Sequence, residues 1–383
     1  MKVLIAVDKF KGTLSGKELS QALLTGLQQE LGQGFTPEIC PIADGGDGTV
    51  DAALAAGFHE IICRVTGPLP AVPGLDTVEA RYAFDLASAT AVIEIAQAGG
   101  IWRLSQDQLD AENATSFGAG ELVKDALERG VRSLVIGVGG SASTDGGAGL
   151  LQALGVSLQD ATGAELAPGG GALGHLASVD VSGFDGRLTG VDVTVACDVT
   201  NPLTGVNGAA AVYGPQKGAD ARQVELLDKN LQKLADAVEN ELKVSRGTFA
   251  NAPGAGAAGG LGFACLSVLG ATMRPGTEVC FELTGFNQKL PGADVVITGE
   301  GKLDTQTLQG KGPAGVAKAA SQQGAKVLAV CGANELDRQT YQGAGFAEVY
   351  SLLGAGATLQ EALANPRPWV EKLGAAIARD YLL

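Results

Sequence analysis

Histidine is scarce in this chain, with only two among 383 residues. His59 and His175 each stand alone, so neither a histidine-rich metal site nor a histidine-dependent nucleophile is indicated. The sequence also lacks the H-E-x-x-H zinc motif, the G-x-S-x-G hydrolase motif and the G-x-x-x-x-G-K-[ST] phosphate-binding loop. We therefore expect any proton transfer to depend on a carboxylate.

Paired cysteines, basic clusters and long apolar runs are missing as well. The six cysteines form no C-x-x-C pair, so we expect reduced, buried thiols. A net charge of −15 without a Lys/Arg cluster argues against a nucleic-acid partner. The longest apolar runs, such as Val327 to Cys331, are far shorter than the ~20 residues of a membrane helix. Asp8 follows the first apolar run too closely for a signal peptide, and we expect a cytoplasmic protein.

What the sequence does contain is glycine, and its most informative stretch is Val131 to Gly149, VRSLVIGVGGSASTDGGAG. The pattern predicts a strand, a Gly/Ser-rich loop and a helix, an arrangement that binds anions through backbone N–H groups. Gly137, Gly139 and Ala142 also fit the G-x-G-x-x-A dinucleotide fingerprint. A purely structural turn remains the alternative, although the polar residues of the loop favour an anion site.

Charged loops follow two further predicted strands near the start of the chain. Lys2 to Val7 reads as a buried strand, and the next loop carries two lysines before a capping box formed by Ser15 and Glu18. Glu38 to Ile42 reads as a second strand, followed by ADGGDGT with two carboxylates three residues apart. Such a loop suits a hard cation or the orientation of a hydroxyl group. A charged surface loop and an ordinary acid-and-glycine turn are the alternatives.

The middle of the chain has a different pattern, because three short β-like segments occur there without long helices between them: His59 to Thr66, Thr77 to Phe84 and Thr90 to Ile95. Alternating strands and helices at both ends of the chain indicate an α/β fold. We expect a doubly wound parallel-sheet domain interrupted by a second, mixed-sheet α/β domain. The predicted boundaries are 1–56, 114–150 and 288–383 for the first domain, and 57–113 and 151–287 for the inserted one.

Polar side chains gather where the predicted strands end. Open α/β sheets bind their ligands at that edge. Lysines neutralise anions and carboxylates hold Mg²⁺, so these residues suit phosphoryl transfer. This pattern by itself does not distinguish a kinase from a dehydrogenase. The set comprises Lys9, Lys11, Asp44, Asp47, Ser141, Asp145, Asp198, Glu300, Lys302, Asp304 and Lys311.

Seven motifs in order along nearly the whole chain resemble the type-1 glycerate kinase family. They are DKFKGTLS at 8–15, ADGGDGT at 43–49, GGSASTDGG at 139–147, CDVTNPLTG at 197–205, YGPQKGA at 213–219, PGAGAAGGLG at 253–262 and ITGEGKLDTQTLQGKGP at 297–313. The resemblance implies ATP- and Mg²⁺-dependent phosphorylation of D-glycerate, on the 2-hydroxyl, to give 2-phosphoglycerate. It also implies two α/β domains with an active-site cleft between them.

The departures of the chain from the family pattern are mild. The family usually has Ser where Lys9 stands, often has Glu at the position of Asp47, and has Asn or Thr at that of Thr144. Lys11 matches the pattern, whereas the departure at Lys9 argues against a catalytic role for that lysine.

Our mechanistic hypothesis assigns the strand-end residues to four tasks. Asp44 or Asp47 orients or deprotonates the substrate hydroxyl, and Lys11 neutralises the glycerate carboxylate or the transferred phosphoryl group. Asp198 or Asp304, together with Glu300, coordinates Mg²⁺, and Asp198 is also counted among the catalytic residues. The residues expected to hold ATP phosphates are Gly139, Gly140, Ser141, Thr144, Asp145, Lys217, Lys302 and Lys311.

Three alternatives remain open on the sequence. The first is phosphorylation of the 3-hydroxyl of glycerate. The second is a nucleotide-cofactor oxidoreductase that uses the Gly137–Gly139–Ala142 turn, with Asp160 near the spacing of the ribose-binding acid. The third is an anion-binding protein without catalysis. The expected partners are D-glycerate and ATP, with no nucleic acid and no membrane, and homo-oligomerisation is left open.

Overall fold

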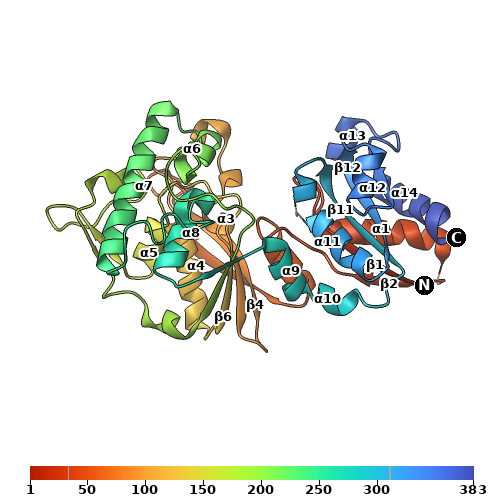
Figure 1. The fold of residues 1–383 in the computed structure, drawn as a ribbon, viewed down its shortest axis with the longest axis horizontal. Helices are drawn as coiled ribbons and strands as arrows, with labels where there is room; N and C mark the ends of the chain where they lie inside the picture. Colours follow the sequence, from red (N-terminus) through yellow and green to blue (C-terminus); the bar gives the residue numbers. More distant parts are fainter. Residues whose placement is uncertain (33, 310–311) are drawn as a thin grey trace. The chain divides into compact units, whose positions relative to one another are not determined.

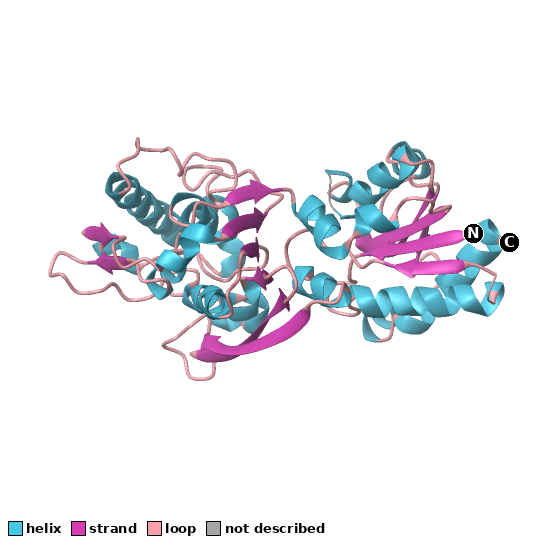
Figure 2. Cartoon of the chain, turned by 90° about the horizontal axis from the view of Figure 1, so that it is seen from below, coloured by secondary structure: helices cyan, strands magenta, loops and turns pink. Residues whose placement is uncertain are grey.

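The computed structural model describes residues 1–32, 34–309 and 312–383, and the chain forms two compact units. Unit 1 comprises Met1–Asp44, Asp51–Gly57 and Thr277–Leu383, and unit 2 comprises Gly45–Val50 and Phe58–Gly276. Figures 1 and 2 show that each unit has its own sheet with helices packed on it. Both units are therefore of the expected α/β class.

The sheet of unit 1 is parallel throughout, as the sequence predicts. Its described strands lie in the order β13-β12-β11-β1-β2, and every neighbouring pair is parallel. The order reverses beside β1, as in doubly wound sheets, and such a reversal is where these sheets bind ligands. The strands are β1 (Lys2–Val7), β2 (Thr36–Ile39), β11 (Val295–Leu303), β12 (Lys326–Asn334) and β13 (Glu348–Ser351).

Helices cover both faces of this sheet, and each face has its own apolar core. Leu19 and Val370 belong to the core on one face, whereas Val316, Phe281 and Tyr341 belong to the core on the other. The capping box predicted at Ser15 and Glu18 is present and begins α1. The helices of unit 1 are α1 (Gly16–Leu31), α9 (Gly276–Thr284), α10 (Phe286–Lys289), α11 (Gly312–Gln322), α12 (Arg338–Gly343), α13 (Leu359–Ala364) and α14 (Arg367–Ile377); α9 begins at the unit boundary, and α2 (Thr49–Ala55) starts in unit 2 and continues into unit 1.

Unit 2 contains a mixed sheet in which the described strands lie in the order β10-β9-β6-β5-β4-β3. The pairs β3–β4 and β4–β5 are antiparallel, and the remaining pairs are parallel. The three strands predicted for the middle of the chain are confirmed within one residue. The strands are β3 (His59–Thr66), β4 (Thr77–Asp85), β5 (Thr90–Glu94), β6 (Ser133–Gly137), β9 (Asp192–Ala196) and β10 (Thr272–Arg274); β7 (Ser157–Gln159) and β8 (Ser178–Asp180) form a separate two-stranded sheet.

The helices of unit 2 share one large apolar core with this sheet. In Figure 1 they gather on one side of it. The amphipathic helix α7 buries its apolar stripe at Leu227, Leu231, Leu234 and Val238. The helices are α3 (Ala96–Gly99), α4 (Phe117–Glu128), α5 (Ala148–Ala153), α6 (Ala209–Tyr213), α7 (Ala221–Glu241) and α8 (Ala257–Ser267).

The predicted domain boundaries are wrong in one large part. We expected 114–150 to return to the first sheet, but β6 pairs in parallel with β5 and β9 and lies in unit 2. An apolar run indicates a buried strand without specifying its neighbours, and the crossover through α4 places β6 directly beside β5. Residues 277–287 belong to unit 1 and 45–50 to unit 2, contrary to the prediction.

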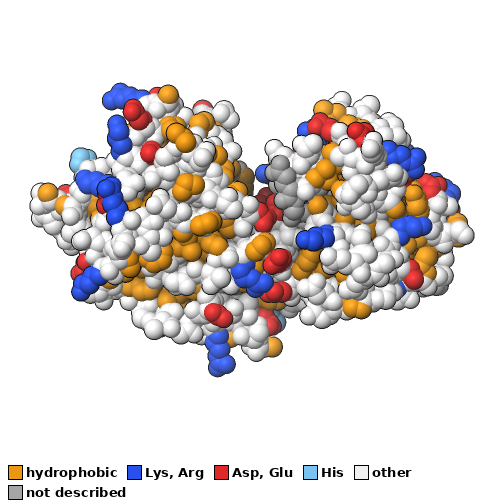
Figure 3. Space-filling model, in the orientation of Figure 1, with side chains coloured by type: hydrophobic (Ala, Val, Ile, Leu, Met, Phe, Trp, Pro, Cys, Tyr) orange, Lys and Arg blue, Asp and Glu red, His pale blue; other side chains and the backbone are white. Residues whose placement is uncertain are grey.

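Two expectations about surface and membrane can be compared with the structure. Among the described residues, we find no helix with both the length and the apolar character required to cross a bilayer. On the face drawn in Figure 3, Lys and Arg side chains are scattered among neutral and acidic ones rather than gathered in a patch.

Candidate functional site

The ADGGDGT motif crosses from unit 1 into unit 2, where residues 45–50 lie against the strand ends. Glu94, the last residue of β5, accepts hydrogen bonds through Oε1 from the N–H groups of Gly48 at 2.9 Å and Val50 at 2.7 Å. Its side chain is buried, with 2% exposed. A buried carboxylate with two N–H donors stabilises the start of α2 and holds this loop in one conformation.

The second glycine-rich motif lies directly against the first. A Cβ atom built on Gly139 would lie 2.8 Å from the Cα of Gly46, and one on Gly137 would lie 2.8 Å from the carbonyl oxygen of Gly45. Only glycine permits backbones to approach this closely. Two motifs about ninety residues apart thus form one loop cluster at the carboxyl end of β6, with Asp47 exposed beside it.

Lys217 lies beneath this cluster and is almost completely buried, with 3% of its surface exposed. Its Nζ donates to Ser141 Oγ at 2.9 Å and to the carbonyl oxygen of Ser143 at 2.5 Å. Burial lowers the pKa of the Lys217 ammonium to about 7, although the charge of Asp145 acts in the opposite direction. The lysine predicted to bind phosphate therefore also braces the loop that carries Ser141.

Asp145 serves as an internal anion of this loop. Its Oδ2 accepts the N–H and Oγ–H of Ser116, each at 2.8 Å, and the N–H of Gly149 at 3.2 Å, while Oδ1 accepts the N–H of Gly147 at 3.1 Å. The side chain is fully buried. The Asp145 carboxylate already accepts these hydrogen bonds inside the loop, and its negative charge would repel a phosphate. The geometry therefore argues against our prediction of Asp145 as an ATP ligand.

Thr144 and Asp198 contrast in their exposure. Thr144 is fully buried, and its Oγ1 has no hydrogen-bond partner among the described residues. Asp198 follows β9 and is exposed, and its Oδ1 accepts the N–H of Gly276 at 2.9 Å. Asp198 is thus held at the carboxyl end of β9 with its carboxylate at the surface. Burial argues against direct contact between Thr144 and a ligand.

The segment Asn251 to Gly262 contains the PGAGAAGGLG motif, a composition that suits a hinge, a close packing contact or a phosphate cradle. It packs against the same loop. A Cβ atom on Gly259 would lie 2.0 Å from the carbonyl oxygen of Ser143. The N–H of Gly146 donates to the carbonyl of Gly259 at 2.9 Å. The packing interpretation therefore accounts for these glycines.

Unit 1 gathers a separate set of charges at the carboxyl ends of β1, β2 and β11. Burial raises the pKa of the Asp8 carboxyl well above its usual range, and the negative charges of Asp44 and Glu300 raise it further. The N–H of Lys9 donates to Asp8 Oδ1 at 2.7 Å, and the Lys9 charge acts in the opposite direction. Asp44 and Glu300, which we predicted from the sequence, are therefore each close enough to Asp8 to raise its pKa. Lys11, in the loop after β1, is exposed.

Lys302, near the end of β11, and Asp304, just after this strand, have local partners. Lys302 Nζ lies 3.0 Å from Glu335 Oε2, and just over half of the Lys302 side chain is exposed. Asp304 Oδ1 accepts the N–H of Gln306 at 2.8 Å, which makes it a turn-forming residue. Lys311 lies outside the described residues. Neither Lys302 nor Asp304 therefore depends on a ligand for its position.

The residues present fit Mg²⁺ in the form in which proteins usually bind it with a nucleotide. Among the described residues, no three Asp, Glu, His or Cys side chains form a ready metal cage. Mg²⁺ commonly takes only one or two carboxylates and fills its remaining positions with phosphate oxygens and water. Burial is the main cause of the raised pKa of Asp8, and the negative charges of Asp44 and Glu300 add to it, so a cation near these carboxylates would be favourable.

Sequence reasoning missed Asp8, Glu94 and Ser116. Asp8 and Glu94 each end a buried strand of the kind already recognised, so their positions alone could have identified them. Ser116 carried no comparable signal, because its contact with Asp145 joins residues 29 apart.

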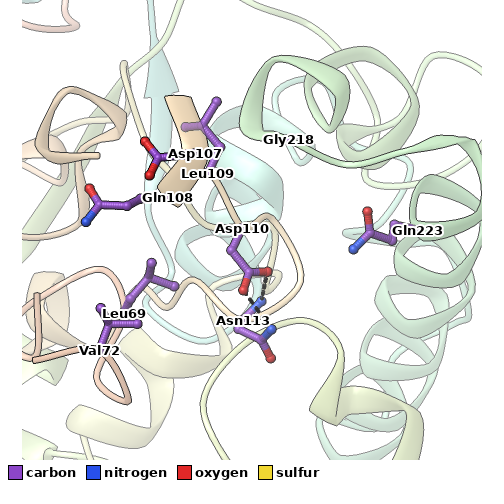
Figure 4. A pocket seen from close by; sticks show the side chains of 9 residues that line it. All are labelled: Leu69, Val72, Asp107, Gln108, Leu109, Asp110, Asn113, Gly218 and Gln223. Carbon is purple, nitrogen blue, oxygen red and sulfur yellow. Dashed lines mark hydrogen bonds between the residues drawn. The ribbon is translucent and has the colours of Figure 1, made fainter. Parts of the chain in front are cut away.

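A pocket of about 400 Å³ in unit 2 contains none of the predicted residues. Figure 4 shows its lining, including the hydrogen-bonded pair Asp110 and Asn113. Its glutamine side chains are already engaged, because Gln108 Oε1 accepts the N–H of Ser105 and Gln223 Oε1 accepts the N–H of Asp220. The pocket therefore offers few unengaged polar groups for a ligand.

Comparison with known proteins gives a consistent result over the full length of the chain. The sequence profile of the glycerate kinase family matches residues 3–382. The chain is 42% identical to "Glycerate kinase" of Bacillus subtilis (strain 168), covering 100% of this chain and 98% of that protein. It is 40% identical to "Glycerate 2-kinase" of Escherichia coli (strain K12), covering 94% and 93%. A crystal structure described as glycerate kinase 2 from Salmonella typhimurium LT2 superimposes with a TM-score of 0.85 at 39% identity, covering 99% and 97%.

Proposed function

The chain belongs to the glycerate kinase family, and from that premise we propose that it transfers the γ-phosphoryl group of ATP to the 2-hydroxyl of D-glycerate, giving 2-phosphoglycerate and ADP. The observation that carries this proposal is the full-length agreement in sequence and fold with the glycerate kinases. The choice of the 2-hydroxyl is supported by the relative named glycerate 2-kinase.

The loop cluster of unit 2 is our candidate for binding the phosphates of ATP. Gly140 is exposed, and the Ser141 hydroxyl is held by Lys217. Backbone N–H groups of Gly139 and Gly140 together with that hydroxyl would supply donors to phosphate oxygens. Lys217 supports this loop and supplies positive charge when protonated.

Carboxylates are our candidates for Mg²⁺ and for the substrate hydroxyl. Glu300 is our candidate Mg²⁺ ligand within unit 1, and Asp198 is a separate candidate within unit 2. Bound Mg²⁺ would neutralise charge on the phosphates. Asp44 or Asp47 would accept a hydrogen bond from the glycerate hydroxyl and so orient it or remove its proton. Lys11 would pair with the glycerate carboxylate, because it is an exposed cation in the loop after β1.

The alternative of a nucleotide-cofactor oxidoreductase has little structural support. That fold requires an acidic residue at the end of the next parallel strand, where it binds ribose. The strand after α5 is β7, which pairs antiparallel with β8 in a separate sheet. Asp160 is engaged with its own turn through Thr162 and Ala164.

A coupled assay of ADP release with ATP and D-glycerate tests the proposal, with L-glycerate and glycerol as control acceptors. We expect turnover with D-glycerate that is abolished by EDTA and restored by Mg²⁺. Phosphorus NMR of the product distinguishes 2-phosphoglycerate from 3-phosphoglycerate. A 3-phosphoglycerate product would contradict the assigned hydroxyl, and tight glycerate binding without ADP release would contradict catalysis altogether.

A further inference from the structure

The two main sheets present four edge strands, and one of them differs from the other three. Exposed edges invite pairing with another chain, and proteins usually shorten them or interrupt them with proline. Within the described residues, β10 has three residues, β13 has four, and β2 has four including Pro37. The edge strand β3 has eight residues and contains neither proline nor glycine.

The pairing of β3 with β4 is uninterrupted. Consecutive partners run from His59 opposite Phe84 to Thr66 opposite Thr77, without a bulge. A bulge would twist the edge away from a second strand, so the uninterrupted register leaves β3 without that protection.

The hydrogen bonds at the end of β3 establish which of its backbone groups point outward. The N–H of Gly67 donates to Asp76 in the chain leading into β4. Because the direction alternates along an antiparallel strand, the N–H groups of Glu60, Ile62 and Arg64 point away from β4. The N–H of Thr66, in the same alternating set, donates to the Glu121 carboxylate of α4 at 2.6 Å, which agrees with this assignment.

We propose that β3 pairs antiparallel with β3 of a second copy of this chain, about a two-fold axis at Ile62. The two six-stranded sheets would then form one continuous sheet. In this register Ile62 faces Ile62 of the partner subunit, and Glu60 faces the partner's Arg64. The outward N–H and C=O groups of Glu60, Ile62 and Arg64 would be paired in both copies, which is the isologous arrangement that two-fold dimers require.

Side chains and charge agree with this register. Glu60, Ile62 and Arg64 are exposed, and 59% of the Ile62 surface is accessible. The central apolar contact would be flanked on both sides by a Glu–Arg pair, which is a favourable cross-strand combination. The charges of Glu60 and Arg64 cancel along this edge. The pairing strand therefore carries no excess negative charge, although the whole chain has a net charge of −15.

The test uses charge reversal on the full-length chain, with sedimentation velocity over a concentration series. We expect a wild-type dimer, and we expect Glu60→Arg and Arg64→Glu each to weaken dimerisation by about tenfold or more, because like charges then face each other twice. An equimolar mixture of the two variants should dimerise again, since every facing pair is then opposite in charge.

Arg64 also lies opposite Glu79 of β4, so reversing its charge changes that pairing as well. A second substitution tests dimerisation without this change. Ile62→Lys places two cations at the two-fold axis and should give a monomer whose far-UV circular dichroism spectrum matches that of the wild type. Leu359→Lys is the matched control, since Leu359 is 63% exposed and lies on α13 of unit 1. This control should remain dimeric.

Three results would overturn the proposal. They are a wild-type chain that is monomeric at all concentrations up to ~100 μM, a dimer that is insensitive to both charge reversals, and a mixture of the two variants that fails to restore dimerisation. If the chain does not self-associate and instead binds a different protein through β3, that result would also contradict the proposal. The residues of β3 take no part in the proposed phosphoryl transfer, so the two proposals can fail independently.

Discussion

The Nζ of Lys217 lies 2.9 Å from the Oγ of Ser141, and this hydrogen bond joins residues that are 76 positions apart. It connects the YGPQKGA motif to the GGSASTDGG motif, inside a region where the lysine is nearly inaccessible to water. Because the buried amine of Lys217 is hydrogen-bonded to a serine of the candidate phosphate loop, the stability of that loop depends on the protonation of the amine.

Replacement of Lys217 by Met should change how stability depends on pH. The folded-state pKa of Lys217, about 7, lies below the ordinary lysine value of 10.5. The unfolded chain therefore binds the proton more readily between these values. The penalty for burying the charge is full below pH 7 and disappears as the pH rises toward 10.5. The unfolding free energy of the wild type relative to Lys217→Met should rise by about 1.4 kcal/mol per pH unit between pH 7 and pH 10.

Urea unfolding of both proteins at several pH values measures this difference. Lys229→Met is the matched control, because Lys229 lies on α7 with 73% of its side chain exposed. The control should track the wild type at every pH. Parallel curves for the wild type and Lys217→Met would contradict the lowered pKa.

Replacement of Asp145 by Ala should destabilise unit 2. It leaves the buried donors of Ser116, Gly147 and Gly149 without their acceptor. The loss of a buried carboxylate with several donors costs about 3 kcal/mol or more. Chemical denaturation measures the loss, with Glu225→Ala, at an exposed position on α7, as the control that should change stability by less than ~0.5 kcal/mol. Stability equal to that of the wild type would mean that Asp145 does not hold the loop.

Replacement of Asp198 by Asn should impair turnover while preserving the fold. The amide oxygen can still accept the N–H of Gly276, whereas the negative charge is lost. We expect kcat to fall by at least ~10²-fold, the usual scale for a positioned acid-base or charge-stabilising group. Asp192→Asn, at an exposed position on the same strand, should retain activity. Wild-type turnover in Asp198→Asn would remove Asp198 from the reaction.

Replacement of Glu94 by Ala should release the segment 45–50. The N–H groups of Gly48 and Val50 would lose their buried acceptor, at a cost of about 1–3 kcal/mol. We expect faster amide hydrogen exchange at these two residues and a lower kcat. Glu94→Gln keeps an accepting oxygen and should recover part of both properties, and Glu79→Ala, at an exposed position on β4, is the control. Unchanged exchange at Gly48 and Val50 would show that Glu94 does not position this loop.

The sequence by itself determined the local elements. The capping box at Ser15, the strand His59–Thr66 and the buried stripe of α7 depend on residues close together in the chain, and periodicity and capping chemistry report such features directly. The same reasoning predicted Asp44, Ser141, Asp198 and Glu300 at strand ends, because parallel strands of an α/β sheet present their carboxyl ends at one edge. Ser141 and Asp198 do follow β6 and β9, whereas Glu300 lies within β11, which continues to Leu303.

Only the tertiary structure decided which strands are neighbours and which charges meet. β6 belongs to the sheet of unit 2 because it pairs with β5 and β9. These pairings join residues that are far apart in the chain, and an apolar run does not specify them. The contact between Gly139 and Gly46, the burial of Lys217 and the internal role of Asp145 likewise arise from segments brought together by folding. Local patterns specify what a segment can be, whereas long-range packing specifies what it touches.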